Sequence, residues 1–322
     1  MKRNNIFLFW STYQESESID EWRNRKMELS DLHFLSLFSN DISGDNIFLY
    51  TYQNIKKSKL TDIYRNIILI DADIVFPYQR AFKSLTDGHS IAHISDLVRI
   101  TEAATKEGVI LDMDAVRINP FPDKSGWMAS GPAKKTGGFA PKWGDAHPPI
   151  TINDNSWDGK ALSSFPCKIN EKTASVAFRL INEIKGSLYS MPKNDSKAWN
   201  YIMWALKEIP LIYEDIHVYP PINFCPLPAW LGSGKCYSLE YPHRFTGKEV
   251  LFGHKLPHID EILTKSYIIQ HFFESAFQKS SINVDLWENI NDGCLLAIEA
   301  ETILERNWRQ ELKNMKGVYN GG

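Results

Sequence analysis

Cysteine is scarce in this sequence, and the few cysteines lie far apart. None of them forms a C-x-x-C pair, and they stand at Cys167, Cys225, Cys236 and Cys294. Zinc sites need closely spaced ligands and disulfide frameworks need many cysteines. Both classes are therefore excluded, and a reducing cytoplasm is the expected location.

The chain also lacks a charge excess and a long apolar run. It carries 36 basic and 39 acidic residues, for a net charge of −3, with no block of about five or six like charges, so nucleic acid is not an expected partner.

No run approaches the roughly 18–20 apolar residues of a spanning helix. The start "MKRNNIFLFW" lacks the apolar core and cleavage site of a secretory signal. An amphipathic C-terminal stretch leaves a peripheral contact at the inner membrane face open.

Of the 322 residues, 43% are apolar, which is enough for a substantial core. The first 125 residues alternate strand-like and helix-like segments, a pattern typical of an α/β domain with a mostly parallel sheet. Strands are expected at Asn5–Trp10, Asn46–Tyr52 and Asn66–Ile70, and a helix around Ser30–Phe38.

A further helix is expected from Ser95 to Gly108, with Ser95 as its cap and Gly108 at its end. It leads into the strand "VILD", so Asp112 and Asp114 fall at the carboxyl end of that strand. Open α/β sheets bind their ligands at this end.

The rest of the chain differs in composition and has fewer regular strand-like and helix-like segments. Glycine, proline, asparagine and tryptophan are scattered through a long irregular segment, Ser125–Gly159, and such segments are more often functional than idle. "VYPPINFCPLPAW" contains too many prolines for a central strand or a helix interior. Helices are expected at Glu171–Ile184, Lys197–Lys207 and about Asp292–Lys313.

Two stretches carry aspartates in D-x-D spacing: "LIDADIV" with Asp71 and Asp73, and "ILDMDAV" with Asp112 and Asp114. Such a pair has three possible interpretations. It can be the solvated end of a strand, the nucleophile and general acid/base of a haloacid-dehalogenase-like phosphatase, or a metal site that binds the diphosphate of a nucleotide-sugar. The phosphatase also needs a second acidic pair further along, and "WGDAHPP" does not supply it.

"HISDLVRITEAATKEGVILDMDAVRINPF" resembles the DXD sugar-binding region of bacterial capsular-polysaccharide-type glycosyltransferases. These enzymes are related to the yeast initiating α-mannosyltransferases and the clostridial glucosylating toxins. The family pattern is S-D-x-x-R, a helix, G-G-x-x-x-D-x-D and a proline, and Glu107 replaces the first glycine. The matching residues are Ser95, Asp96, Arg99, Gly108, Asp112, Asp114 and Pro120. "FLFW", Leu29–Tyr52, "VYPPINFCPLPAW" and "SYIIQHFFESAF" are similar to further family segments in the same order.

The resemblance implies a GT-A type nucleotide-diphospho-sugar transferase fold, a Rossmann-like mixed sheet with helical additions. Residues 1–125 would form the nucleotide-sugar-binding half, and residues 126–322 the acceptor-side and helical part of the same catalytic unit. It implies metal-dependent transfer of a sugar, with retention of configuration, from a nucleotide-sugar such as a UDP-sugar. The acceptor would be a glycan, a lipid-linked glycan or a protein.

The resemblance also implies roles for single residues. Asp114 would bind Mn²⁺ or Mg²⁺ directly, and Asp112 would contact ribose or reach the metal through water. Asp96 and Arg99 would bind the donor sugar or phosphate beside Ser95, and His271 would be a further metal or diphosphate ligand. In "LIDADIV" the family requires no acid pair, so Asp71 and Asp73 would be structural or solvated.

Each role has an ordinary alternative. Trp10 would stack on uracil or pack in the core, and Asp96 with Arg99 would form an ion pair on a helix surface. His271 would be an ordinary surface or core histidine. The i,i+4 pair His89 and His93 has zinc-binding spacing but lacks a third ligand nearby, and no spacing singles out Asn153, Asp154 and Asn155 as acceptor contacts. For the whole chain, the alternative is a non-catalytic nucleotide-sugar or glycan binding protein on the same scaffold.

Overall fold

The fold comes from a computed structural model. It describes residues 3–130, 163–171, 173–174, 182, 216–219, 221–224, 236–237, 244–245, 259–270 and 295–321. The expected helix Lys197–Lys207 and most of the expected helix Glu171–Ile184 lie outside these residues.

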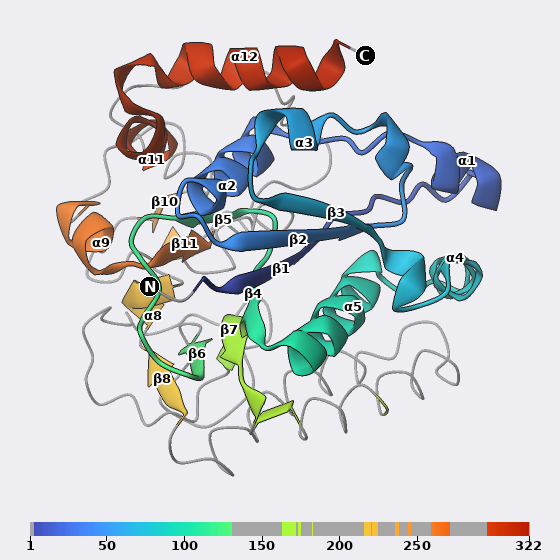
Figure 1. Cartoon of the computed structure of the whole chain (residues 1–322), viewed down its shortest axis with the longest axis horizontal. Helices are drawn as coiled ribbons and strands as arrows, with labels where there is room; N and C mark the ends of the chain where they lie inside the picture. The colour runs from blue at the N-terminus through green and yellow to red at the C-terminus, as the bar shows by residue number, and fades with distance from the viewer. Residues whose placement is uncertain are drawn as a thin grey trace.

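Four parallel strands form one half of the main sheet (Figure 1). They stand in the order β3 (Ile67–Asp71), β2 (Asn46–Thr51), β1 (Asn5–Phe9) and β4 (Gly108–Ile110). In β1, Ile6 and Leu8 are buried on one face of the sheet and Phe7 and Phe9 on the other. Strands that are buried on both faces read as continuous apolar runs. This explains why "IFLF" and "IFLY" lack alternation.

The other half of the sheet is mixed. Strand β7 (Ser163–Ile169) is antiparallel to β4, and β6 (Trp127–Ser130) and β8 (His217–Tyr219) follow it. Among the described residues the sheet thus has seven strands, in the order β3-β2-β1-β4-β7-β6-β8. The expected α/β fold with a Rossmann-like mixed sheet is confirmed.

The interpretation of Ser125–Gly159 as irregular is wrong at its start, because residues 127–130 form β6. Trp127 and Met128 are buried between neighbouring strands, so tertiary packing selects a strand where the composition suggests a loop. The sheet also draws strands from both sides of residue 125. The division of the chain at that point stays a prediction.

Helices cover both faces of the sheet (Figure 1). Helix α5 (Ile91–Lys106) packs on the face that carries Phe7 and Ile110, next to α4 (Tyr78–Thr86). Helix α2 (Asp31–Asp41) packs on the opposite face, and α3 (Leu60–Ile63) lies on the same side. Short helices α1 (Ile19–Asn24), η1 (Ile55–Lys57) and η2 (Ala72–Ile74) occupy the connections.

Helix α5 begins one turn earlier than expected. Its N-cap is Ser90, whose side chain accepts a hydrogen bond from the backbone N–H of Ala92. Ser95 is therefore an interior helix residue and not a cap. The helix ends at Lys106, its C-cap Glu107 has a φ of 53°, and Gly108 already belongs to β4.

Gly108 is needed for close packing. A Cβ atom at this position would lie 2.3 Å from the carbonyl oxygen of Asn5. Since no side chain fits there, only glycine lets β4 begin beside β1.

Two small sheets complete the described strands. Strand β5 (Ala115–Arg117) pairs antiparallel with β11 (Ile268–Gln270), and β9 (Cys236–Tyr237) pairs with β10 (Arg244–Phe245). Helices α8 (Pro221–Phe224) and α9 (Ile259–Lys265) precede β9 and β11. Pro221 occupies the first position of α8, where its missing N–H costs nothing.

The C-terminal segment forms α11 (Leu295–Leu304), η6 (Glu305–Asn307) and α12 (Trp308–Asn320). Helix α12 packs against α2: the rings of Tyr319 and Phe34 meet at 5.5 Å, and the hydroxyl of Tyr319 donates to the carbonyl of Met27 at 2.7 Å. Lys316 pairs with Asp31 at 2.9 Å. In the part of the chain that the structure describes, no helix is long and apolar enough to span a membrane.

Candidate functional site

The D-x-D pair lies in the turn between β4 and β5, at the carboxyl end of a central strand. The backbone N–H of Ala115 donates a hydrogen bond to the backbone carbonyl of Asp112 at 3.2 Å, and this bond closes the turn. The side chain of Asp112 is 34% exposed, whereas Asp114 is buried. The expected position of both carboxylates is confirmed.

Arg99 links helix α5 to this turn. Its Nη2 donates to Asp96 Oδ1 at 2.7 Å, and its Nη1 donates to Asp112 Oδ1 at 2.5 Å and to the carbonyl of Leu111. Residues 96 and 99 stand three apart on one helix face, and β4 runs directly beneath that face. One guanidinium group therefore fixes Asp96, Asp112 and the end of β4.

Two members of this cluster are buried. Asp96 is 8% exposed and Arg99 3%. The i,i+3 ion pair of the ordinary alternative is therefore present, but it is buried and does not lie on the helix surface. Removing one partner of a buried ion pair leaves the other charge buried without compensation, so each side chain stabilises the other.

The pKa values follow from this burial. Burial raises the pKa of Asp96, Arg99 opposes that rise, and the carboxylate of Asp112 adds to it. For Arg99, burial lowers the pKa, but Asp112 and Asp96 together outweigh it and raise the pKa. Arg99 is therefore a permanent positive charge at the end of β4.

Ser95 contributes through its backbone. Its carbonyl oxygen accepts a hydrogen bond from Arg99 Nε at 3.4 Å, one turn along the helix. The residue is buried beside Asp96. The structure thus places Ser95 in the cluster, although not as the helix cap.

Trp10 follows β1 at the same edge of the sheet, because β1 and β4 are parallel neighbours. Its indole Nε1 donates to the carbonyl of Glu28 at 2.8 Å, and its ring lies 4.1 Å from that of His33. The indole is half-buried and packs against the core. A core contact for Trp10 is confirmed, and stacking on a base stays a prediction.

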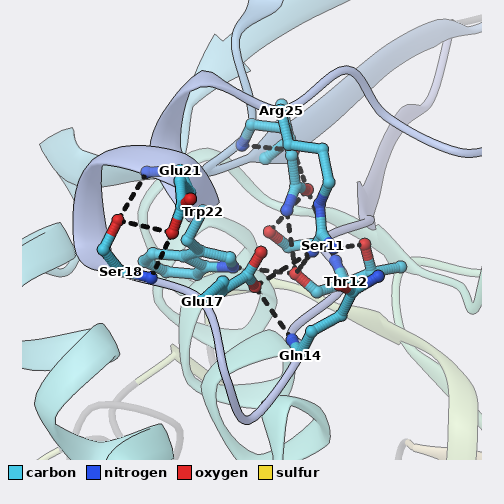
Figure 2. Close-up of polar contacts among 10 residues, drawn as sticks. Ser11, Thr12, Gln14, Glu17, Ser18, Glu21, Trp22 and Arg25 are labelled. Atoms are coloured by element: carbon cyan, nitrogen blue, oxygen red, sulfur yellow. Dashed lines mark hydrogen bonds and ion pairs between the residues drawn. The ribbon is translucent and has the colours of Figure 1, made fainter.

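The loop after Trp10 forms a polar cluster that sequence patterns did not reveal (Figure 2). The carbonyl of Thr12 accepts from Gln53 Nε2 at 2.9 Å, Trp22 Nε1 at 2.7 Å and Arg25 Nη2 at 2.7 Å. The hydroxyl of Ser11 donates to Gln53 Oε1 at 2.7 Å. The available signal in the sequence was a polar residue at the second position after each of two neighbouring strands, β1 and β2.

The same loop is also tied to helix α1. Figure 2 shows Glu17 accepting from the backbone N–H of Gln14 and from Arg25, at 2.8 and 3.2 Å. Ser18 and Glu21 form a capping box that starts the helix. The chain that follows β1 is therefore held in place by its own side chains.

The other acidic pair has local structural contacts. Asp71 pairs with Arg23 and accepts the backbone N–H of Asp73 at 3.0 Å. Asp73 accepts the backbone N–H of Tyr78 at 2.8 Å and so starts α4. Both carboxylates thus have partners at the end of β3, as a structural role requires.

Of the remaining candidates, the structure describes only His89 and His93. His89 precedes the N-cap of α5 and His93 lies in its first turn, so they are not two helical ligands. Burial, and then the charge of His89, lower the pKa of His93 to about 4. Four candidates lie outside the described residues: His271, Asn153, Asp154 and Asn155.

The donor set around the turn fits a hard divalent cation that shares its coordination with a phosphate. Among the described residues, no group of three or more histidines, cysteines or carboxylates gathers as a metal site. Mg²⁺ commonly uses only one or two carboxylates, with substrate phosphates and waters as its other ligands. Asp112 and Asp114 would be two such carboxylates.

Comparisons with known proteins give similarity to solved structures alone. No protein-family model matches the chain, and no curated protein matches it. A solved structure, the PaToxG Glycosyltransferase, is similar with a TM-score of 0.39 and 10% identity, over 66% of this chain and 70% of that one.

Proposed function

We propose that this chain is a metal-dependent glycosyltransferase that moves a sugar from a nucleotide-sugar, a UDP-sugar, to a glycan, lipid-linked or protein acceptor. One observation carries the proposal: the buried residues Asp96 and Arg99 form an ion cluster with the partly exposed Asp112, two residues before Asp114 at the carboxyl end of β4. The resemblance in sequence marks the same four residues. Function belongs to the site and not to the fold.

Arg99 positions the site. It is charged at every relevant pH, and its contacts with Asp96 and Leu111 hold it in one orientation. Asp112 therefore presents its carboxylate from a fixed place, with its side chain 34% exposed to an incoming ligand. A preorganised site of this kind costs little reorganisation during the reaction.

Asp112 and Asp114 are the residues that would hold Mn²⁺ or Mg²⁺. His271 is proposed as a further ligand, since it directly follows Gln270, whose β11 partner Ala115 directly follows Asp114. When bound, the cation supplies positive charge that stabilises the departing diphosphate. Asp112 supplies one carboxylate oxygen to Arg99, and the same side chain is proposed to contact ribose or a water.

Transfer with retention of configuration accords with the acid groups that this site offers. Asp96 is buried and bonded to Arg99, so it is not available to deprotonate an acceptor. Asp112 is likewise engaged by Arg99. Retention needs no dedicated general base, and the proposal assigns none.

A panel of nucleotide-sugars with manganese, assayed for release of the nucleotide without any acceptor, tests this function. We expect UDP release from one UDP-sugar, and loss of that release with a chelator. Tight binding of a nucleotide-sugar without any release would instead establish the non-catalytic binding protein. If the protein neither binds any nucleotide-sugar nor releases a nucleotide from one, the assignment is overturned.

A further inference from the structure

Strand β5 begins directly after Asp114 and is only three residues long, Ala115–Arg117. Among the described residues its one strand neighbour is β11. The backbone N–H of Ile118 donates to the carbonyl of Tyr267 at 2.9 Å, on the β11 side. Since the backbone groups of alternate strand residues point to opposite sides, those of Ala115 and Arg117 point away from β11.

Helix α2 lies on that other side (Figure 1). The hydroxyl of Ser36 donates to the carbonyl of Ala115 at 2.7 Å. The hydroxyl of Ser39 accepts the backbone N–H of Arg117 at 3.0 Å. The two serines are three residues apart on one face of the helix, so they meet the groups that a neighbouring strand would otherwise pair.

Both hydroxyl groups are held in place. Ser36 is fully buried and Ser39 is 2% exposed. Ser39 Oγ also donates to the carbonyl of Ser36 at 2.8 Å. Beyond the helix, Arg117 Nη1 donates to Asp45 at 2.5 Å and to Ser43 at 2.6 Å. The strand that follows Asp114 is thus fastened to α2 and to the loop after it.

We infer that Ser36 is a positioning residue for Asp114. The N–H of Ala115 is held by the carbonyl of Asp112, and the carbonyl of Ala115 is held by Ser36. The peptide groups on both sides of Ala115 are therefore fixed, which fixes where the adjacent Asp114 carboxylate begins. Sites for ions and phosphates tolerate displacements of only about 0.5 Å. The inference rests on the proposed function, because it needs Asp114 to bind a metal with the nucleotide.

The variant Ser36→Ala removes the hydroxyl, and Tyr64→Phe is its matched control. Tyr64 is also buried, and its hydroxyl donates to the carbonyl of Phe34 on α2 at 3.0 Å, away from β5. Each variant deletes one buried hydroxyl that donates to one backbone carbonyl, and the hydroxyl of Tyr64 also lies 3.9 Å from the sulfur of Met315. Any general loss of stability should therefore be similar in the two, as urea denaturation measures.

Calorimetric titration of UDP with and without manganese separates the roles. We expect Ser36→Ala to reduce the gain in UDP affinity from manganese by about tenfold or more, with metal-free UDP affinity unchanged. Tyr64→Phe should keep the full gain. Ser39→Ala, which frees the other end of β5, should change the gain in the same direction and serves as the test if Ser36→Ala does not fold.

Two negative results have different meanings. If manganese does not strengthen UDP binding by the wild-type protein, the proposed function fails, and the inference fails with it. If the wild type shows the gain and the serine variants keep as much of it as Tyr64→Phe, the positioning role alone is overturned.

Discussion

His33 makes the stability of this protein depend on pH in a way that one substitution can isolate. It occupies the third position of α2, is 3% exposed, and its Nδ1 accepts the backbone N–H of Ser30 at 3.0 Å. Because Nδ1 is an acceptor here, the ring is neutral. If Nδ1 were protonated, its N–H would face the backbone N–H of Ser30, and two hydrogen-bond donors would repel each other at the start of the helix, beside Trp10.

The sign and size of the effect follow from the pKa of His33. Burial lowers it to about 3, against about 6.5 in the unfolded chain. The stabilisation is therefore complete above about pH 6.5 and is lost as the pH falls toward 3, by about 1.4 kcal/mol per pH unit. At pH 5 the loss is about 2 kcal/mol, and it barely changes whether the folded pKa is 3 or 4.

The variant His33→Gln tests this value, because glutamine also completes a capping box but does not titrate. Urea denaturation at pH 7.5 and pH 5 should show that the variant loses about 2 kcal/mol less than the wild type over this interval. Other groups, including His93, titrate in both proteins and cancel in the difference. Parallel losses in the two proteins would refute the argument.

Three other substitutions have expected outcomes. Asp114→Asn should lower UDP release by about 10²–10³ without lowering the metal-free melting temperature, since removing one acid relieves repulsion in the cluster; a near wild-type rate would contradict the assigned site. Asp73→Asn keeps an acceptor for the N–H of Tyr78 and should stay within a few-fold of wild-type release, whereas lost turnover in a folded variant would mean that the wrong acidic pair was chosen. Glu107→Gly should raise the free energy of unfolding by up to about 1 kcal/mol, because glycine adopts a φ of 53° without strain; urea denaturation showing no gain would contradict this.

Sequence patterns located the strands well and the start of α5 less well. Continuous apolar runs predicted β1, β2 and β3 to within one residue at most ends. Ser90 and Ser95 are both good caps, and the expectation chose the later one. The buried face in fact begins earlier, with His93, so the first turn of the helix lies upstream of Ser95.

The candidate site was only partly predictable. The motif places Asp96, Arg99 and Asp112 near one another, but their burial depends on how α5 packs over the sheet, which no local pattern encodes. The contacts of Thr12 and Ser11 with Gln53 join positions about forty residues apart. No local sequence pattern near Ser11 and Thr12 predicts their contact with Gln53.

The packing of α12 on α2 bears on how the protein is made. Met27 and Tyr319 are separated by 292 positions and yet share a hydrogen bond. At roughly 5–20 residues per second of synthesis, the face of α2 that receives α12 stays uncovered on the ribosome for about 15–60 s. Over that time the nascent chain exposes Phe34 and its neighbours, so chaperone binding should be strongest just before residue 308 and should fall once Tyr319 has emerged.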